Sequence, residues 1–118
     1  MPQYRISNAA RADIVDILRL PQTQFGDYAR QRYQTLILTV LQDIAGPPCR
    51  IGSHDHDELA PGLRSYHLIY SHQQAKQLHG VVKTPRHIVF YRVGNGDMIE
   101  IVRLLHDAME VQLHLPND

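Results

Sequence analysis

Six side chains in the C-terminal half of the sequence have the charge and hydrogen-bonding capacity that a binding or catalytic site needs. They are Arg64, Tyr66, Arg86, Arg92, Arg103 and His106. A guanidinium group binds carboxylate or phosphate in a fixed, two-pronged geometry. Each of these residues alone is more commonly a surface or ion-paired side chain. Several arginines that converge on one small sheet favour a surface that binds an anionic partner.

Residues 54–58, His-Asp-His-Asp-Glu, are of types that ligate zinc, nickel or iron. Two histidines in alternation lie on one side of an extended segment. The segment lies between Gly52 and Pro61, however, and no motif supplies a further ligand. The single cysteine, Cys49, excludes an internal disulfide and a Cys-based zinc site. We therefore interpret residues 54–58 as a solvated loop and expect neither a metal nor a cofactor.

Asp13 and Asp16 form the other cluster that resembles a catalytic arrangement. Paired acids in general acid–base catalysis must face each other across a substrate. Two carboxylates three residues apart on a helix usually lie on its wet face. We therefore interpret both as solvated.

Length and composition predict one domain spanning residues 1–118. The 43% hydrophobic and 20% charged residues are typical of a soluble globular protein. Twelve basic and twelve acidic residues cancel, which argues against nucleic-acid binding through overall basicity. The cancellation is uneven along the chain, because no acidic residue lies between Glu58 and Asp97. That window holds five cations: Arg64, Lys76, Lys83, Arg86 and Arg92.

The N-terminal half predicts a strand and then a helical hairpin. Residues 3–6 suit a strand, and Ser7 suits a helix N-cap. Apolar residues at helical spacing follow until Pro21, where we expect the first helix to stop. A second apolar stripe runs from Phe25 to Ile44, and Gly46 is expected to end that helix in a left-handed conformation.

The C-terminal half predicts three strands, over residues 63–70, 87–93 and 98–105. Gly94–Asp97 is a turn signal that joins the last two as an antiparallel hairpin. Residues 71–85 are interpreted as an insertion between strands, in which residues 81–83 could rejoin the sheet. Residues 108–115 suit one or two helical turns. This order indicates an α+β fold, with the helices on one face of a mainly antiparallel sheet.

Four blocks in this order resemble the ParE branch of the RelE/ParE toxin superfamily. They are residues 4–13 (YRISNAARAD), 58–66 (ELAPGLRSY), 86–93 (RHIVFYRV) and 101–107 (IVRLLHD). The resemblance implies the same fold, a strand, a helical hairpin and three further strands of one sheet. The insertion at about 71–85 departs from the family pattern, in which a tight turn connects the strands.

The resemblance also implies a function, the toxin half of a type II toxin–antitoxin, or plasmid stabilisation, system. ParE toxins bind and poison DNA gyrase and so arrest growth. They are neutralised by a cognate ParD-like antitoxin with a ribbon-helix-helix part and a tail that folds over the toxin. An apolar groove between helices and sheet would suit such a tail. We therefore expect a cytoplasmic toxin that acts by binding, with no membrane partner and no sequence-specific DNA binding of its own.

Relatives of the RelE type offer an alternative, because they cleave messenger RNA on the ribosome. In that interpretation Arg64, Arg86 and Arg103 would hold the charged phosphate, and His106 would act as acid or base. The lysine-rich face of those ribonucleases is missing here. We therefore rank gyrase binding first, with no catalytic residue, ahead of the ribonuclease and an inactive relative.

Overall fold

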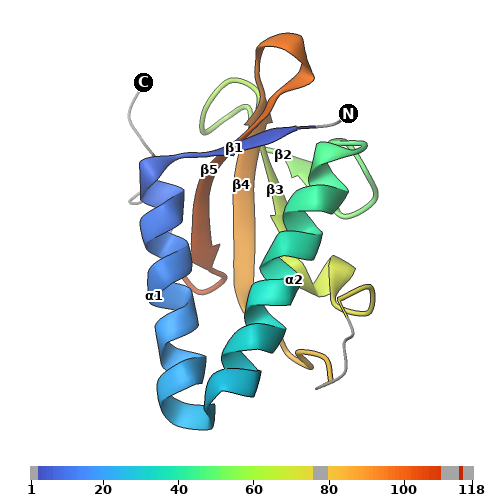
Figure 1. Cartoon of the computed structure of the whole chain (residues 1–118). Coiled ribbons are helices and arrows are strands. Elements are labelled where there is room, and N and C mark those ends of the chain that lie inside the picture. The colour runs from blue at the N-terminus through green and yellow to red at the C-terminus, as the bar shows by residue number, and fades with distance from the viewer. Residues whose placement is uncertain (1–2, 76–79, 110–114, 116–118) are drawn as a thin grey trace.

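The computed structural model describes residues 3–75, 80–109 and 115. One mixed sheet has the strand order β1-β5-β4-β3-β2 (Figure 1). The strands are β1 (Tyr4–Ile6), β2 (Ser53–Asp55), β3 (Leu63–His67), β4 (His87–Val93) and β5 (Ile99–His106). β1 pairs with β5 in parallel, and all other pairs are antiparallel. The predicted α+β class is confirmed, although the sheet contains one more strand than expected.

Two antiparallel helices, α1 (Asn8–Phe25) and α2 (Asp27–Ala45), cover one face of this sheet (Figure 1). The predicted N-cap is confirmed, because the Ser7 hydroxyl accepts from the Ala10 N–H at 3.0 Å. The second helix ends at Ala45 as expected. Gly46 is not left-handed, however, since its φ is −72°.

Pro21 does not end the first helix, contrary to our expectation. α1 continues through it to Phe25. A proline lacks one N–H, so it removes one hydrogen bond near an exposed helix end, where little packing depends on it. The helix ends instead at Gly26, whose φ of 90° is open to glycine and strained for other residues. The second helix therefore begins at Asp27 and not at Phe25.

The predicted strand over residues 63–70 is too long, since β3 ends at His67 and a 3₁₀ turn, η1 (Leu68–Ser71), follows. The His67 ring causes this change of direction, because its Nδ1 accepts from the Ile69 N–H at 3.0 Å. β2 was missed, because Ser53–Asp55 belong to the segment interpreted as a loop. β4 has the predicted bounds, and β5 begins and ends one residue later than predicted.

The segment interpreted as an insertion, residues 71–85, adds no strand to the sheet in its described residues. Residues 81–83 do not rejoin the sheet, although Val82 packs against the main core. Residues 76–79 lie outside the described residues. So do 110–114, which hold most of the predicted C-terminal helical turns.

The core has two parts, one on each face of the sheet. The larger lies beneath the helices and includes Leu36, Leu41 and Tyr91. The smaller, on the other face, is formed by Leu63, Phe90, Val102 and Leu105, and it is covered by Leu59, Ala60 and Leu115. In the described part of the chain, no helix has the length and apolar character needed to cross a bilayer.

Candidate functional site

Arg103 is held by Asp13 on α1, which corrects the interpretation of Asp13 as a solvated residue. Its Nε and Nη2 donate to the two Asp13 carboxylate oxygens at 2.7 and 2.8 Å. The side chains are only 22% and 13% exposed. This hydrogen bonding raises the pKa of Arg103 above its usual value. Asp16, by contrast, is 71% exposed and pairs with Arg19, as a solvated residue would.

Asp13 also closes an open edge of the sheet. β1 pairs with β5 only as far as Ile101, so later backbone groups of β5 need other partners. The Leu104 N–H donates to Asp13 Oδ2 at 3.0 Å, and the Ser7 hydroxyl donates to the Val102 carbonyl at 2.9 Å. The N-terminal half of α1 thus continues the role of β1.

Tyr66 is a core residue with no exposed surface. Its hydroxyl lies 2.8 Å from the Ser71 hydroxyl, which in turn donates to Asp43 of α2 at 2.5 Å. This chain of hydrogen bonds satisfies the phenol inside the fold. Through Ser71, Tyr66 thus helps to hold η1 against α2.

Arg64 and Arg92 are each hydrogen-bonded to a neighbouring strand. Arg64 Nε donates to the Ser53 hydroxyl at 2.7 Å, and that hydroxyl lies 2.7 Å from the phenol of Tyr91. Burial raises the pKa of Tyr91. Arg92 Nη2 donates to Glu100 Oε1 at 3.3 Å, from the paired position on β5.

A cluster of ionisable groups gathers at the opposite end of the sheet. Asp107 Oδ1 accepts from Nε and Nη2 of Arg86 at 3.2 and 3.0 Å. Its Oδ2 lies 3.1 Å from His67 Nε2. Because His67 Nδ1 accepts from a backbone N–H, Nε2 carries the proton and donates to the carboxylate. The hydrogen bond from His67 and the Arg86 guanidinium lower the pKa of Asp107.

His87 and His106 face each other at this end, on the first and last residues of their paired strands. Their ring centroids are 5.4 Å apart and nearly perpendicular. His87 Nδ1 lies 2.6 Å from the Tyr33 hydroxyl, which also accepts from the Arg86 N–H. Burial, followed by the neighbouring His106, lowers the pKa of His87 to about 4. Burial raises that of Tyr33 to about 12, so both are neutral at pH 7.

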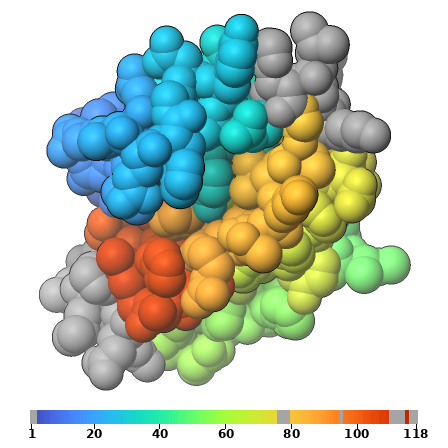
Figure 2. Space-filling view, turned by 90° about the horizontal axis from the view of Figure 1, so that it is seen from below, coloured from blue at the N-terminus to red at the C-terminus, as the bar shows by residue number. Residues whose placement is uncertain are grey.

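A groove opens beside this cluster, between the tip of the helical hairpin and the segment that precedes β4. We call it the tip groove. Its volume is about 690 Å³. Figure 2 views the molecule from the hairpin-tip end and shows this segment between the helices and the end of β5. The described lining contains no carboxylate and comprises Ile17, Leu20, Pro21, Gln24, Phe25, Ala29, Arg32, Tyr33, Gly80–Thr84, Arg86, His87 and His106.

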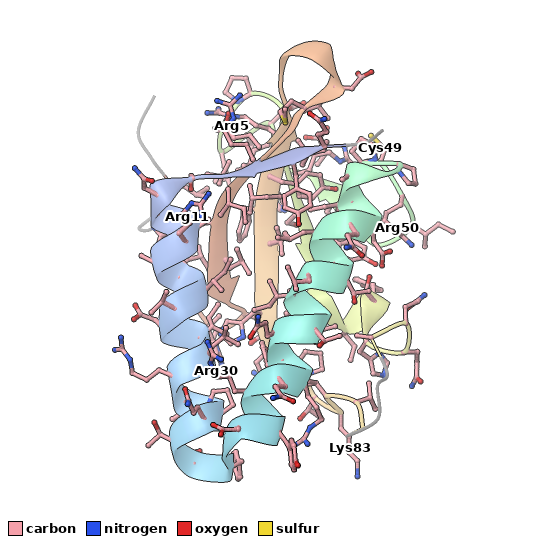
Figure 3. The ribbon with its side chains drawn as sticks, in the orientation of Figure 1. Arg5, Arg11, Arg30, Cys49, Arg50 and Lys83 are labelled. Carbon is pink, nitrogen blue, oxygen red and sulfur yellow. The ribbon has the colours of Figure 1, made fainter. Side chains whose placement is uncertain are left out.

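A second groove, which we call the outer groove, runs between α1 and α2. All its described lining residues except Ile6 of β1 come from these two helices. Its volume is about 660 Å³, and Ile14, Leu18 and Ile37 contribute to its apolar floor. Arg11 on α1 and Arg30 on α2 border it, and both are labelled in Figure 3. The described lining residues again include no carboxylate.

Residues 54–58 do not form a metal site within the described chain. His56 hydrogen-bonds instead to Ser65 through Nε2, at 2.7 Å, and approaches Glu58 at 3.3 Å. His54 lies on β2 and is exposed. His56 therefore joins the turn that follows β2 to β3.

A comparison with known families decides what this fold belongs to. Residues 4–111 match the model of the ParE toxin of the type II toxin–antitoxin system, parDE. The chain belongs to this family. It is 29% identical to Toxin ParE1 of Caulobacter vibrioides over 98% of this chain and 99% of that protein. It is 30% identical to Toxin ParE1 of Mycobacterium tuberculosis (strain H37Rv), over 96% and 97% of the two chains.

ParE-family toxins belong to type II systems, in which the toxin has an antitoxin as its partner. The six residues singled out from the sequence are divided among separate places in this fold. Arg86 and His106 lie together at one end of the sheet. Arg64 pairs with Tyr91, which is four residues, or about 13 Å, along β4 from His87, the partner of His106. Arg103 faces α1, and Tyr66 is buried.

Sequence reasoning missed three residues that complete this cluster: Tyr33, His87 and Asp107. A signal was available for two of them, because His87 and Asp107 lie at or just beyond the ends of predicted strands. Tyr33 gave none, since it formed part of a regular helical stripe.

Proposed function

We propose that this chain is the toxin of a type II toxin–antitoxin system, that it arrests growth by binding DNA gyrase, and that a cognate antitoxin neutralises it. The observation that carries the proposal is the family match over nearly the whole chain, together with curated toxins that align end to end. Such a system acts in the cytoplasm, where gyrase works.

Binding accounts for the arrangement of charged side chains better than RNA cleavage does. The ribonuclease alternative needs Arg64, Arg86, Arg103 and His106 around one phosphate. Arg103 is engaged by Asp13, and Arg64 lies far along the sheet from His106. His87, the nearest additional base, is hydrogen-bonded to Tyr33 and has a pKa of about 4, which makes it a poor base at neutral pH.

The proposed contacts with the target are Arg86 and His106, beside the tip groove. Arg86 is 61% exposed although Asp107 orients it, so its outer edge is accessible to an anionic group. Arg64 and Arg92 are secondary candidates, since each already donates to a neighbour. Tyr66 and Arg103 contribute by holding the sheet and helices together.

For the antitoxin we propose the outer groove as the main docking surface. The resemblance suggested a groove between helices and sheet, but the outer groove follows two helices and suits an amphipathic segment. Arg11 and Arg30 favour an acidic one. Because both grooves are lined by α1, an antitoxin bound in the outer groove would hinder the target sterically at the tip groove without contacting Arg86 or His106.

The test is a gyrase supercoiling assay with purified toxin, alone and with its cognate antitoxin. We expect inhibition by the toxin, relief by the antitoxin, and at least roughly tenfold weaker inhibition by Arg86→Ala. Arg19→Ala is the matched control for inhibition by the toxin alone, because Arg19 is an exposed arginine that does not line the tip groove. Full supercoiling at saturating toxin, with cleavage of ribosome-bound message that His106→Ala abolishes, would establish the ribonuclease function instead.

A further inference from the structure

Large apolar side chains line the tip groove, and two of them are exposed to solvent within the described part of the chain. Phe25, at the end of α1, is 73% exposed, and Leu20 is 59% exposed. Both line the groove, with Val81 and Val82 from the segment before β4. Exposed apolar residues that gather in a concavity, and are not scattered singly, indicate an interaction surface. The groove's size, about 690 Å³, is within the range of pockets that bury a compact ligand or peptide motif.

The border of the groove is positively charged. Arg32, Lys83 and Arg86 line it, and its described lining residues include no Asp or Glu. Lys83 projects at the lower edge of the molecule in Figure 3. This arrangement attracts a ligand that presents carboxylates around an apolar centre, and it repels a basic one.

The inner wall of the groove is polar but already satisfied. Tyr33 and His87 are hydrogen-bonded to each other, and the Arg86 N–H donates to the same tyrosine oxygen. Asp107 fixes the Arg86 side chain through two hydrogen bonds. A ligand therefore meets a preorganised wall, and the cost of ordering these side chains on binding is reduced.

We propose that the tip groove docks an acidic segment of the toxin's target protein, which inserts an aromatic or aliphatic side chain against Phe25 and Leu20 and places carboxylates near Lys83 and Arg86. The target and the antitoxin thus use different grooves as their primary sites. This inference rests on the proposed function in one respect only, that the chain has a protein target.

The experiment compares matched variants of the two grooves. In the tip groove the variants are Phe25→Ser and Lys83→Glu. The controls, Val15→Ser and Arg11→Glu, alter an exposed apolar residue and a cation of the outer groove. Each variant is tested for growth arrest on expression, for affinity to the cognate antitoxin, and for its thermal unfolding midpoint. All four positions are exposed, so the unfolding midpoint should stay close to that of the unaltered chain.

We expect expression of the tip-groove variants to leave at least about ten times more surviving colonies than expression of the unaltered chain. Their affinity for the antitoxin should stay within about twofold of that of the unaltered chain. The outer-groove variants should arrest growth fully and bind the antitoxin about tenfold more weakly. Full arrest by Phe25→Ser and Lys83→Glu would overturn the inference. So would a loss of antitoxin affinity in them as large as in the controls.

The same experiment separates this inference from the choice of gyrase. If the unaltered chain arrests growth while gyrase remains active, the target is wrong and the groove assignment is still decided by the variants. If the unaltered chain causes no arrest, both proposals fail.

Discussion

Asp13 and Asp16 have the same side chain and lie one helical turn apart, yet their surroundings give them different roles. Asp13 accepts two hydrogen bonds from Arg103 and one from the backbone of β5. Asp16 has only an exposed partner, Arg19, at 3.5 Å. Exposed ion pairs contribute little to stability, whereas removal of one member of a largely buried pair leaves an uncompensated charge.

Replacement of these two residues should therefore have unequal effects. We expect Asp13→Ala to lower the free energy of unfolding by about 2–4 kcal/mol, because Arg103 and the Leu104 N–H lose their acceptor. Asp16→Ala should change it by less than about 0.5 kcal/mol. Urea denaturation of both variants measures the difference. Equal values would mean that the Asp13 contacts contribute no net stability.

His87 should make the fold sensitive to mild acid. Its folded pKa of about 4 lies below the ordinary value of 6.5, so the unfolded chain takes up a proton first as pH falls. Stability due to neutral His87 is present above pH 6.5 and declines progressively toward pH 4. The other groups that act on it are Tyr33, His67, His106, Asp107 and, from α1, Asp13.

We expect the thermal unfolding midpoint to decrease as the pH is lowered from 6.5 to 4. The decrease should correspond to at most about one extra proton bound by the unfolded chain. His87→Gln keeps a hydrogen-bonding side chain near Tyr33 but cannot titrate. Its midpoint should fall less over this interval. An unchanged slope in His87→Gln would assign the acid sensitivity to other groups.

At the scale of elements, the hairpin between α1 and α2 depends on one residue. Gly26 has φ 90° and ψ −173°, a region that other residues rarely adopt. No atom lies within 4 Å of an added Cβ, so the obstacle is the backbone itself. Gly26→Ala should therefore cost about 1–3 kcal/mol of stability. Gln24→Ala, in the same exposed turn, should cost less than about 0.5 kcal/mol, and urea denaturation measures both.

The sequence predicts most elements because their signals are local. Ser7 is an N-cap next to its helix, and Gly94–Asp97 forms the turn between the two strands that it separates. The errors arose where distant contacts decide. Ser53–Asp55 becomes a strand only because β3, eight residues further along the chain, offers a free edge. Pro21 is a different case, because it is tolerated close to the exposed end of its helix.

The candidate site was less predictable than the fold, for a similar reason. Arg86 and His106 were identified by residue type. The pairing of His87 with His106 that places them side by side depends on the register of β4 and β5, which the sequence alone does not show. Asp13 looked solvated because Asp16 follows three residues later, and two carboxylates at that spacing usually lie on the wet face of a helix. Its burial depends on Arg103, which lies at the far end of the chain. Local patterns contain no information about such a pair.

For the whole molecule, the net charge of zero conceals two grooves whose described lining residues are all neutral or basic. If an acidic antitoxin docks in the outer groove, its carboxylates are attracted to Arg11 and Arg30, and dissolved salt screens this attraction. We expect its affinity to fall by about tenfold between 50 and 500 mM sodium chloride, mainly through slower association. Stopped-flow binding measures this. A salt-independent association rate would mean that the arginines do not steer the partner.

The pairing of β1 with β5 has a consequence for synthesis. Ser7 and Val102, which are hydrogen-bonded where these strands meet, are 95 residues apart in the sequence. At ordinary elongation rates, the ribosome needs about 5–20 seconds to make the intervening chain. During that interval the first strand has no neighbour and the helices have no complete sheet beneath them. A chain cut short before Ile99 therefore lacks β5, which pairs with both β1 and β4, and it cannot complete the sheet.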